Sequence, residues 1–482
     1  MDALVYVIIA LGAILLALIA VILIRALRFK PRPEPKPLEN TVEFDKDGAI
    51  EALRALVRCK TISYRDPALE DEAEFEKFVS LLPTLYPEVY KVCTLTRFCG
   101  RGLLFKWEGE SHDAPAVMMS HYDVVPINES EWTHPPFDAE LLDGVIYGRG
   151  TLDTKVTLNA VLYAANTLIA SGYTPKSDIY FAFSGSEEIN GEGALAIANY
   201  FEENKITPAV VLDEGGAVTS RVFPGVKRDC AFVGIAEKGI LDLKYTVKSK
   251  GGHASAPPPH TPVGELAIAC SRVESKPFPF KMTKPAREMF DTLGRHSSFL
   301  YRMIFANLWC FGGIIKLLCN KSGGDLNAML RTTVAFTQMQ GSSASNVIPP
   351  EASMVSNIRL NPADTIDTAA EYIKNVVDSE RVDVTVLHGM NPSKISTTDS
   401  EAYDNIARAV VSTWRGVIVS PYLMMQCSDS RHWSRFSDKV YRFSAMDLTS
   451  EERRTIHGND EHIRVDCALR AVEFYIRLLG MY

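Results

Sequence analysis

Several features that mark common classes of protein are absent from this sequence of 482 residues. Its nine cysteines include no C-x-x-C pair, which argues against a structural zinc ribbon and favours small buried hydrophobic residues. Acidic residues outnumber basic ones by 59 to 51, giving a formal charge of -8. A protein that binds nucleic-acid phosphates needs a net basic surface or stripe. We therefore expect no nucleic-acid partner.

A long apolar segment does stand at the N-terminus, where Ala3 to Ile24 contains no charged residue. As a helix it would match a hydrocarbon core of about 30 Å. A secretory signal has a basic region before a shorter apolar stretch, whereas only Met1 and Asp2 precede this run. A core helix is disfavoured because the segment is apolar on every face. We predict a single-pass transmembrane anchor over residues 1–28.

The flanking sequence leaves the side of the membrane open. Basic residues follow the apolar run and by the positive-inside rule would place the body in the cytoplasm: Arg25, Arg28, Lys30 and Arg32. Against this, two N-glycosylation triplets begin at Asn128 and Asn320, although such triplets are common by chance. Proline then occupies every second position from Pro31 to Pro37, which predicts an extended stalk over residues 29–47.

The body combines two patterns of secondary structure. Over residues 48–235, strands expected at 116–120, 178–183 and 209–212 alternate with helices expected at 159–170 and 193–202. This alternation is typical of a mostly parallel α/β sheet, in which ligands bind at the carboxyl ends of the strands. The pattern resumes over residues 391–482. We therefore predict an α/β catalytic domain formed by these two parts of the chain.

Residues 236–390 instead follow the order β-α-β-β-α-β, which predicts an inserted ferredoxin-like α+β domain. Its expected strands cover 241–247, 332–338, 354–360 and 382–387, and its expected helices cover 263–273 and 369–377. A long insert over residues 276–328 contains an apolar stretch from Phe299 to Leu318. Core packing is the commonest explanation of such a stretch, and a partner interface, a tunnel wall or a membrane contact are alternatives.

Metal-binding residue types follow the expected strands. In Ser120-His121-Tyr122-Asp123, His121 can ligate zinc while Asp123 accepts the other ring N–H and fixes the tautomer. In the glycine-rich segment ending at Asp153, the two carboxylate oxygens can bridge two metals about 3.5–4 Å apart. Taken alone, the first segment is equally compatible with a solvated loop and the second with a helix N-cap.

Two pairs of adjacent acids also follow apolar strands, and acids there are costly to bury without a cation. Glu187 and Glu188 form the first pair, and we assign Glu188 as a ligand and Glu187 as general base. Asp213 and Glu214 form the second, with Asp213 as the chosen ligand and Glu214 as the alternative. His457 supplies a second imidazole. Five such segments in order indicate a metal-dependent hydrolase.

Together these segments resemble the di-zinc peptidase family of carboxypeptidase S, aminoacylase, the carnosine dipeptidases and the succinyl-diaminopimelate and acetylornithine deacylases. The matching segments are S-H-Y-D, G-R-G-T-L-D-T-K, S-G-S-E-E, L-D-E-G-G, K-G-G-H-A-S and I-H-G-N-D-E. The similarity runs from about residue 48 to the C-terminus. The D-E-G-G form and the long insert are most similar to the carboxypeptidase S branch, which includes secreted N-acyl-amino-acid hydrolases.

The resemblance implies two Zn²⁺ ions per subunit, with Co²⁺ or Mn²⁺ as alternatives. The implied ligands are His121 and Asp213 for one ion, Glu188 and His457 for the other, and Asp153 as the bridge. Glu187 would be the catalytic base beside Asp123, and the peptide bond after Asp153 is expected to be cis.

The resemblance also implies substrate contacts from the inserted domain. His253 would stabilise the oxyanion or hold the substrate, and in relatives that share their active sites it reaches across a homodimer. The long insert argues against such sharing here. Asn346 and Arg359 would bind the substrate carboxylate, for which the planar guanidinium is suited. The inserted domain would then be a lid or a dimerisation domain.

The expected reaction is hydrolysis of the amide bond before a C-terminal amino acid in small peptides or N-acyl amino acids. A deacylase acting on another N-acylated metabolite would use the same metal chemistry. An inactive, membrane-anchored binding protein is the alternative from another class. The complete set of ligands and the base argues against that alternative.

Overall fold

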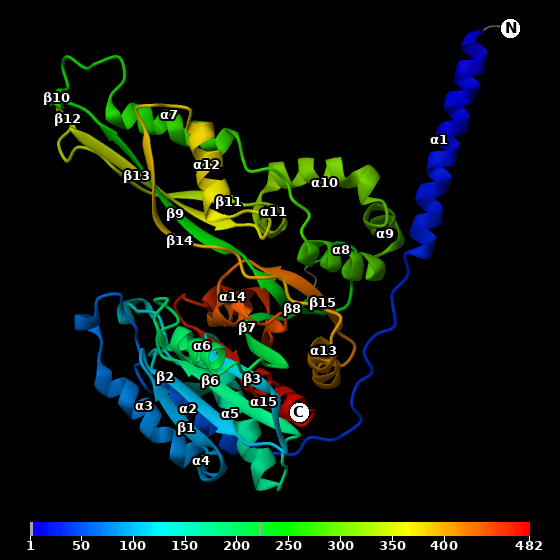
Figure 1. The fold of residues 1–482 in the computed structure, drawn as a ribbon, viewed down its shortest axis with the longest axis vertical. Coiled ribbons are helices and arrows are strands. Elements are labelled where there is room, and N and C mark those ends of the chain that lie inside the picture. Colours follow the sequence, from blue (N-terminus) through cyan, green and yellow to red (C-terminus); the bar gives the residue numbers. More distant parts are fainter. Residues whose placement is uncertain (1–2, 221–222) are drawn as a thin grey trace.

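A twisted eight-stranded sheet forms the centre of the body in this computed structural model, which describes residues 3–220 and 223–482 (Figure 1). The strand order is β1-β2-β6-β3-β7-β16-β8-β15. β3 runs parallel to β6 and β7, β7 to β16, and β8 to β15. The strands are β1 (Thr94–Phe98), β2 (Gly102–Trp107), β3 (Ser111–His121), β6 (Ser177–Ser184), β7 (Val210–Thr219), β8 (Cys230–Glu237), β15 (Ile418–Met424) and β16 (Val440–Asp447). The expected mostly parallel sheet is thus confirmed.

Helices cover both faces of this sheet. The larger core lies under α2, α3, α5, α13 and α15, and a smaller one lies under α6 around the buried Trp433. The helices of the body are α2 (Lys46–Val57), α3 (Glu72–Leu85), α4 (Pro87–Val92), α5 (Lys155–Ala170), α6 (Gly193–Glu203), α13 (Glu401–Thr413), α14 (Ser450–Thr455) and α15 (Val465–Leu479). A small separate sheet joins β4 (Glu140–Leu142), β5 (Val145–Tyr147) and β17 (His462–Arg464). All nine cysteines are free.

A second, antiparallel sheet of four strands has the order β11-β13-β9-β14. It is formed by β9 (Gly239–Lys248), β11 (Thr333–Gln340), β13 (Glu351–Leu360) and β14 (Asp383–Met390). The helices α7 (Pro262–Ser275) and α12 (Ile366–Val377) pack on it around a core of its own. A two-stranded pairing of β10 (Gly252–His253) with β12 (Val347–Ile348) lies at the tip of this part, far from the central sheet (Figure 1).

Four helices make up the long insert between α7 and β11: α8 (Lys284–His296), α9 (Phe299–Phe305), α10 (Leu308–Ser322) and α11 (Gly324–Leu330). They do not join the core of the second sheet. Instead α8 packs against β15, the edge strand of the central sheet. Phe290 of α8 and Phe305 of α9 meet Phe223 in a separate core.

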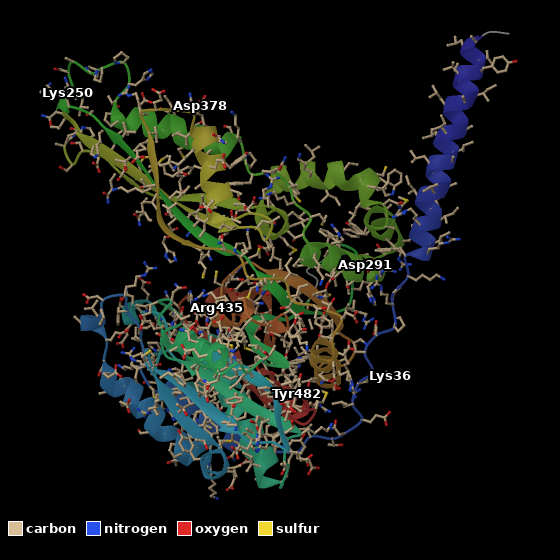
Figure 2. All side chains as sticks on the ribbon, in the orientation of Figure 1. Lys36, Lys250, Asp291, Asp378, Arg435 and Tyr482 are labelled. Atoms are coloured by element: carbon tan, nitrogen blue, oxygen red, sulfur yellow. The ribbon has the colours of Figure 1, made fainter. Side chains whose placement is uncertain are left out.

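The N-terminal helix α1 (Ala3–Arg28) is long and apolar enough to cross a membrane, a property that a signal sequence shares. The segment after it is extended, as its prolines predict, yet it is fastened along the body (Figure 2). The Arg228 guanidinium binds the Glu34 carboxylate at 2.5 Å, and the Leu38 N–H donates to Ser412 Oγ at 2.8 Å. This linker (residues 29–45) therefore differs from the expected stalk, because its polar groups find partners on the body.

Candidate active site

The carboxyl ends of the central strands bring the five candidate segments together. His121 is the last residue of β3, and Glu187 and Glu188 follow β6. Asp213 and Glu214 lie within β7, which is paired in parallel with β3. Asp153 is supplied by the loop before α5, and His457 by the loop after α14. This convergence at one edge of a parallel sheet is the arrangement that the sequence pattern predicts.

Asp153 lies between the two imidazoles and offers one carboxylate oxygen to each. Its Oδ1 is 2.9 Å from His121 Nε2, and its Oδ2 is 3.1 Å from His457 Nε2. Glu188 Oε2 lies 3.1 Å from the same nitrogen of His457. The peptide bond between Asp153 and Thr154 is cis, as the family resemblance implies.

His121 is oriented by Asp123, but through a different atom from the one expected. Its Nδ1 is 3.0 Å from the backbone oxygen of Asp123 and 3.4 Å from Oδ1. The Asp123 carboxylate instead accepts the backbone N–H groups of Glu187 at 3.0 Å and Glu188 at 3.2 Å, and the Ser63 hydroxyl at 2.7 Å. Asp123 thus holds the backbone of the acidic pair as well as the ring of His121.

Of the second acidic pair, the structure places Glu214 rather than Asp213 beside the imidazole. Glu214 Oε1 lies 3.4 Å from His121 Nε2. Asp213 is engaged elsewhere, because its carboxylate accepts the backbone N–H of Ser430 at 2.8 Å and that of Glu214 at 2.9 Å. This geometry favours the alternative ligand of the sequence analysis, since Asp213 supports the loop that carries Ser430.

The pKa shifts in the cluster indicate that a bound cation would stabilise its buried carboxylates. Burial raises the pKa of Glu187 well above its usual range, and that of Glu214 to about 8. Burial would also raise the pKa of Asp153, but hydrogen bonds with the two imidazoles lower it. Hydrogen bonds with Asp153 and Glu188 raise the pKa of His457 to about 10.

The donor atoms of the cluster fit a transition metal. Their ligand atoms form two overlapping groups, each within 4.8 Å: His121, Asp153 and Glu188, and His121, Glu187 and Glu214. Imidazole nitrogen and carboxylate oxygen are the donors that Zn²⁺ uses in hydrolytic sites, and buried carboxylates are stabilised by metal binding. The site can therefore hold metal.

Two buried charged residues near the cluster were missed in the sequence analysis. Glu461, the last residue of the matching segment I-H-G-N-D-E, accepts the backbone N–H groups of the loop that carries Asp153. Arg431 is buried, and its Nη2 donates to Asn190 Oδ1 at 2.9 Å. Its Nε and Nη1 have no hydrogen-bond partner among the described residues. The segment with Glu461 was recognised but only its histidine was assigned, and Ser428-Asp429-Ser430-Arg431 matches no pattern considered there.

The three expected substrate residues do not lie together. His253 ends β10 and Asn346 directly precedes β12, the two strands at the tip of the second sheet in Figure 1. The Asn346 backbone oxygen accepts the N–H of Ala254 at 2.9 Å. His253 is exposed there, and its Nδ1 lies 2.7 Å from Ser255 Oγ. Arg359 lies at the other end of that sheet, where its guanidinium is 3.8 Å from the Cys427 sulfur of the body.

Comparison with known proteins agrees with this site. The model of peptidase family M20/M25/M40 matches residues 117–480, which include all five candidate segments. The chain belongs to this family. It is therefore a hydrolase of the M20 type, which acts on amide bonds.

Two curated relatives match over nearly the whole chain. A probable carboxypeptidase S-like protein of Dictyostelium discoideum is 33% identical, over 97% of this chain and 92% of its own. An N-fatty-acyl-amino acid synthase/hydrolase of Xenopus tropicalis is 34% identical, over 96% of this chain and 93% of its own. Among solved structures, an M20 family metallo-carboxypeptidase from Sulfolobus solfataricus has the same fold. Its TM-score is 0.66 at 18% identity, covering 90% of this chain and 99% of its own.

Proposed function

We propose that this M20 enzyme hydrolyses the amide bond before a C-terminal amino acid, in N-acyl amino acids or small peptides. The observation that carries the proposal is Asp153, whose two oxygens each face a different imidazole, with Glu187 in the same cluster. The names of the two relatives, a carboxypeptidase S-like protein and an N-fatty-acyl-amino acid synthase/hydrolase, support this choice of substrate class.

Two zinc ions would be held by five side chains of the cluster, with Co²⁺ or Mn²⁺ as alternatives. When bound, such ions lower the pKa of a water molecule and polarise a carbonyl oxygen. We assign Asp153 as the bridge, His457 and Glu188 to one ion, and His121 and Glu214 to the other. Asp213, chosen first from the sequence, is then a supporting residue, because its oxygens already accept two backbone N–H groups.

Glu187 is proposed as general base. Its backbone N–H is fixed by the Asp123 carboxylate at 3.0 Å, which aims its side chain at the cluster beside His121. Burial raises the pKa of Glu187, and this suits a carboxyl group that must hold a proton for part of the cycle. It would take a proton from the attacking water and deliver it to the departing amine nitrogen.

Residues 48–235 and 391–482 are proposed as the catalytic domain, and residues 236–390 as an inserted lid or dimerisation domain. Within the insertion, α8–α11 lie against the catalytic domain rather than on the second sheet. Arg359, at the base of that insertion, is proposed to bind the substrate carboxylate. His253 and Asn346 lie at its far tip, so we propose that they serve the active site of a second copy in a homodimer. The oxyanion would then be stabilised by His253 of the other chain.

Residues 1–28 are proposed to remain as a membrane anchor. The last turn of α1 and the first residues of the linker after it are bound to the body through specific groups. Arg25 Nε donates to the Ala306 backbone oxygen at 3.1 Å, and Arg295 donates to the backbone oxygen of Lys30 at 3.0 Å. A segment removed during secretion would not need these contacts.

The test is hydrolysis by the full chain in detergent, with zinc and with a chelator. The panel holds dipeptides, N-blocked dipeptides, acetyl-amino acids and long-chain acyl-amino acids. Release of a free C-terminal amino acid that stops with chelator supports the proposal, and the best substrate separates peptides from acyl-amino acids. Release from other N-acylated compounds alone would identify a different deacylase, and no turnover with metal bound would contradict the proposal.

A further inference from the structure

The helix pair α9–α10 of the long insert meets α1 at a defined depth. Asn307, fully buried between the two helices, donates from Nδ2 to the backbone oxygen of Ile22 at 3.1 Å. Ile22 precedes Arg25, the first charged residue after the apolar run, by three residues. Because a helix rises about 1.5 Å per residue, the start of α10 lies about 5 Å inside that boundary. Interfacial helices insert about 5–10 Å below the membrane surface.

The outer face of α10 is apolar and open to solvent. Trp309 is 58% exposed, Ile314 56% and Leu317 67%. α9 adds two further exposed side chains, Phe299 and Leu300. Neither helix contains an acidic residue. An apolar surface of this kind marks a binding site for a membrane or another protein.

The arrangement of the helices favours the membrane. α9 and α10 are bent by 100° relative to each other, neither is long enough to span a bilayer alone, and α10 lies crosswise to α1 (Figure 1). A helix lying across the direction of a span runs along the membrane surface. A tryptophan on its exposed face is typical of the interface, and the Trp309 Nε1–H donates to Asn307 Oδ1 at 3.3 Å.

The other side of the pair is joined rigidly to the body. Phe305 of α9 packs with Phe223 and with Phe290 of α8, which in turn lies against the edge of the central sheet. Four residues after the end of α1, Arg32 binds Asp291 of α8 at 2.8 Å, and Asp291 is labelled in Figure 2. The apolar face cannot turn inward without breaking these contacts.

We propose that α9 and α10 insert their apolar face into the same lipid leaflet that α1 enters, as a second membrane contact. This rests on the proposed anchoring by α1. The partner is the acyl-chain region of the bilayer, because the Ile22–Asn307 contact fixes the pair at that depth. Lys316, an exposed basic residue of α10, would reach the lipid phosphates.

The tryptophans provide a direct test. Trp309 is the exposed one of five, since the other four are at most 9% exposed and α1 contains none. The full chain is reconstituted into phosphatidylcholine vesicles, with or without phosphatidylcholine brominated on its acyl chains. In the parent protein, brominated lipid should lower the tryptophan emission by the same amount as the substitution Trp309→Phe does. In the Trp309→Phe variant, brominated lipid should leave the emission unchanged. Aqueous iodide should leave Trp309 unquenched.

Quenching of Trp309 by iodide but not by brominated lipid would overturn the proposal. Quenching by neither agent would also overturn it and would indicate that another protein surface covers Trp309. The double variant Ile314→Glu, Leu317→Glu should abolish the lipid quenching, whereas Leu387→Glu, an exposed apolar residue of β14, should not. Carbonate extraction of the same vesicles reports on α1 alone. If the protein resists extraction but its emission is not quenched by brominated lipid, the membrane contact of α9 and α10 is refuted and the proposed anchoring by α1 is not.

Discussion

Arg149 and Glu461, 312 positions apart in the chain, form a buried ion pair with Nη1 and Oε2 2.6 Å apart. The other oxygen of Glu461 accepts the backbone N–H groups of Leu152 at 2.7 Å and of Asp153 at 3.2 Å. Glu461 therefore positions the loop whose carboxylate faces both imidazoles. The loop is also tight at Gly150, where a Cβ would lie 2.9 Å from a methyl carbon of Val124.

Glu461→Gln should therefore weaken metal binding and lower kcat as well as reduce stability. Breaking one partner of a buried ion pair costs about 3–5 kcal/mol. Thermal unfolding and bound metal per chain are the measurements, with Glu451→Gln, an exposed neighbour, as control. Removing Arg149 as well, by Arg149→Gln, should restore part of the stability but not the metal. Normal metal content in the single variant would show that Glu461 only stabilises the fold.

Glu187→Gln should abolish turnover while keeping the metal. A general base contributes roughly 10²–10⁴-fold to the rate, and the amide cannot accept the proton of the attacking water. The measurements are kcat on the best substrate of the panel and metal content. Glu192→Gln, exposed on the same loop, is the matched control. Activity within tenfold of the parent enzyme would exclude Glu187 as the base.

The variants Glu214→Gln and Asp213→Asn should show which of the two residues is a metal ligand and which only supports the loop around Ser430. Glu214 faces His121, so its loss should remove about one metal ion per chain and most activity. Asp213 binds the backbone of Ser430, so its amide should keep both ions and lower the melting temperature. Elemental analysis of dialysed protein decides between the two. The opposite result would return the ligand role to Asp213.

His253→Ala should be inactive alone yet recover activity when mixed with Glu187→Gln. In a mixed dimer, one active site would combine an intact Glu187 with His253 of the other chain. The control mixture is Glu187→Gln with His457→Ala, whose two lesions fall in one cluster and should not complement. Absence of recovery in co-expressed, co-purified dimers would contradict action across a dimer.

The sequence was sufficient for the parallel character of the central sheet, for its strands β3, β6 and β7, and for the residues that gather at their carboxyl ends. It did not predict β1, β2, β8, β15 or β16. The ends of β3 and β6 coincide with His121 and Ser184, because acids and imidazoles directly after apolar strands interrupt the pattern clearly. The sequence could not decide between Asp213 and Glu214 as the ligand. Both lie in one strand, and their roles depend on which face of the sheet each side chain points to. Geometry alone shows that Glu214 faces His121.

Contacts between distant segments were also beyond the sequence. Proline spacing predicts an extended linker but not that Glu34 will meet Arg228 on the body. The apolar residues of α10 predict burial, because periodicity does not distinguish a core from a lipid-facing surface. His253 and Arg359 both belong to the second sheet, yet only the pairing of its strands shows that they lie at opposite ends.

The linker contacts along the body have a kinetic consequence. With Glu34, Leu38 and Asn40 all bound to the body, this stretch of chain cannot act as a loose tether. If α1 is the anchor that we propose, the enzyme would keep one orientation relative to the bilayer. Acyl-amino acids dissolved in that bilayer would then reach the enzyme by lateral diffusion. Its rate on them would follow their mole fraction in the lipid, and dilution with inert lipid would slow it at constant bulk concentration.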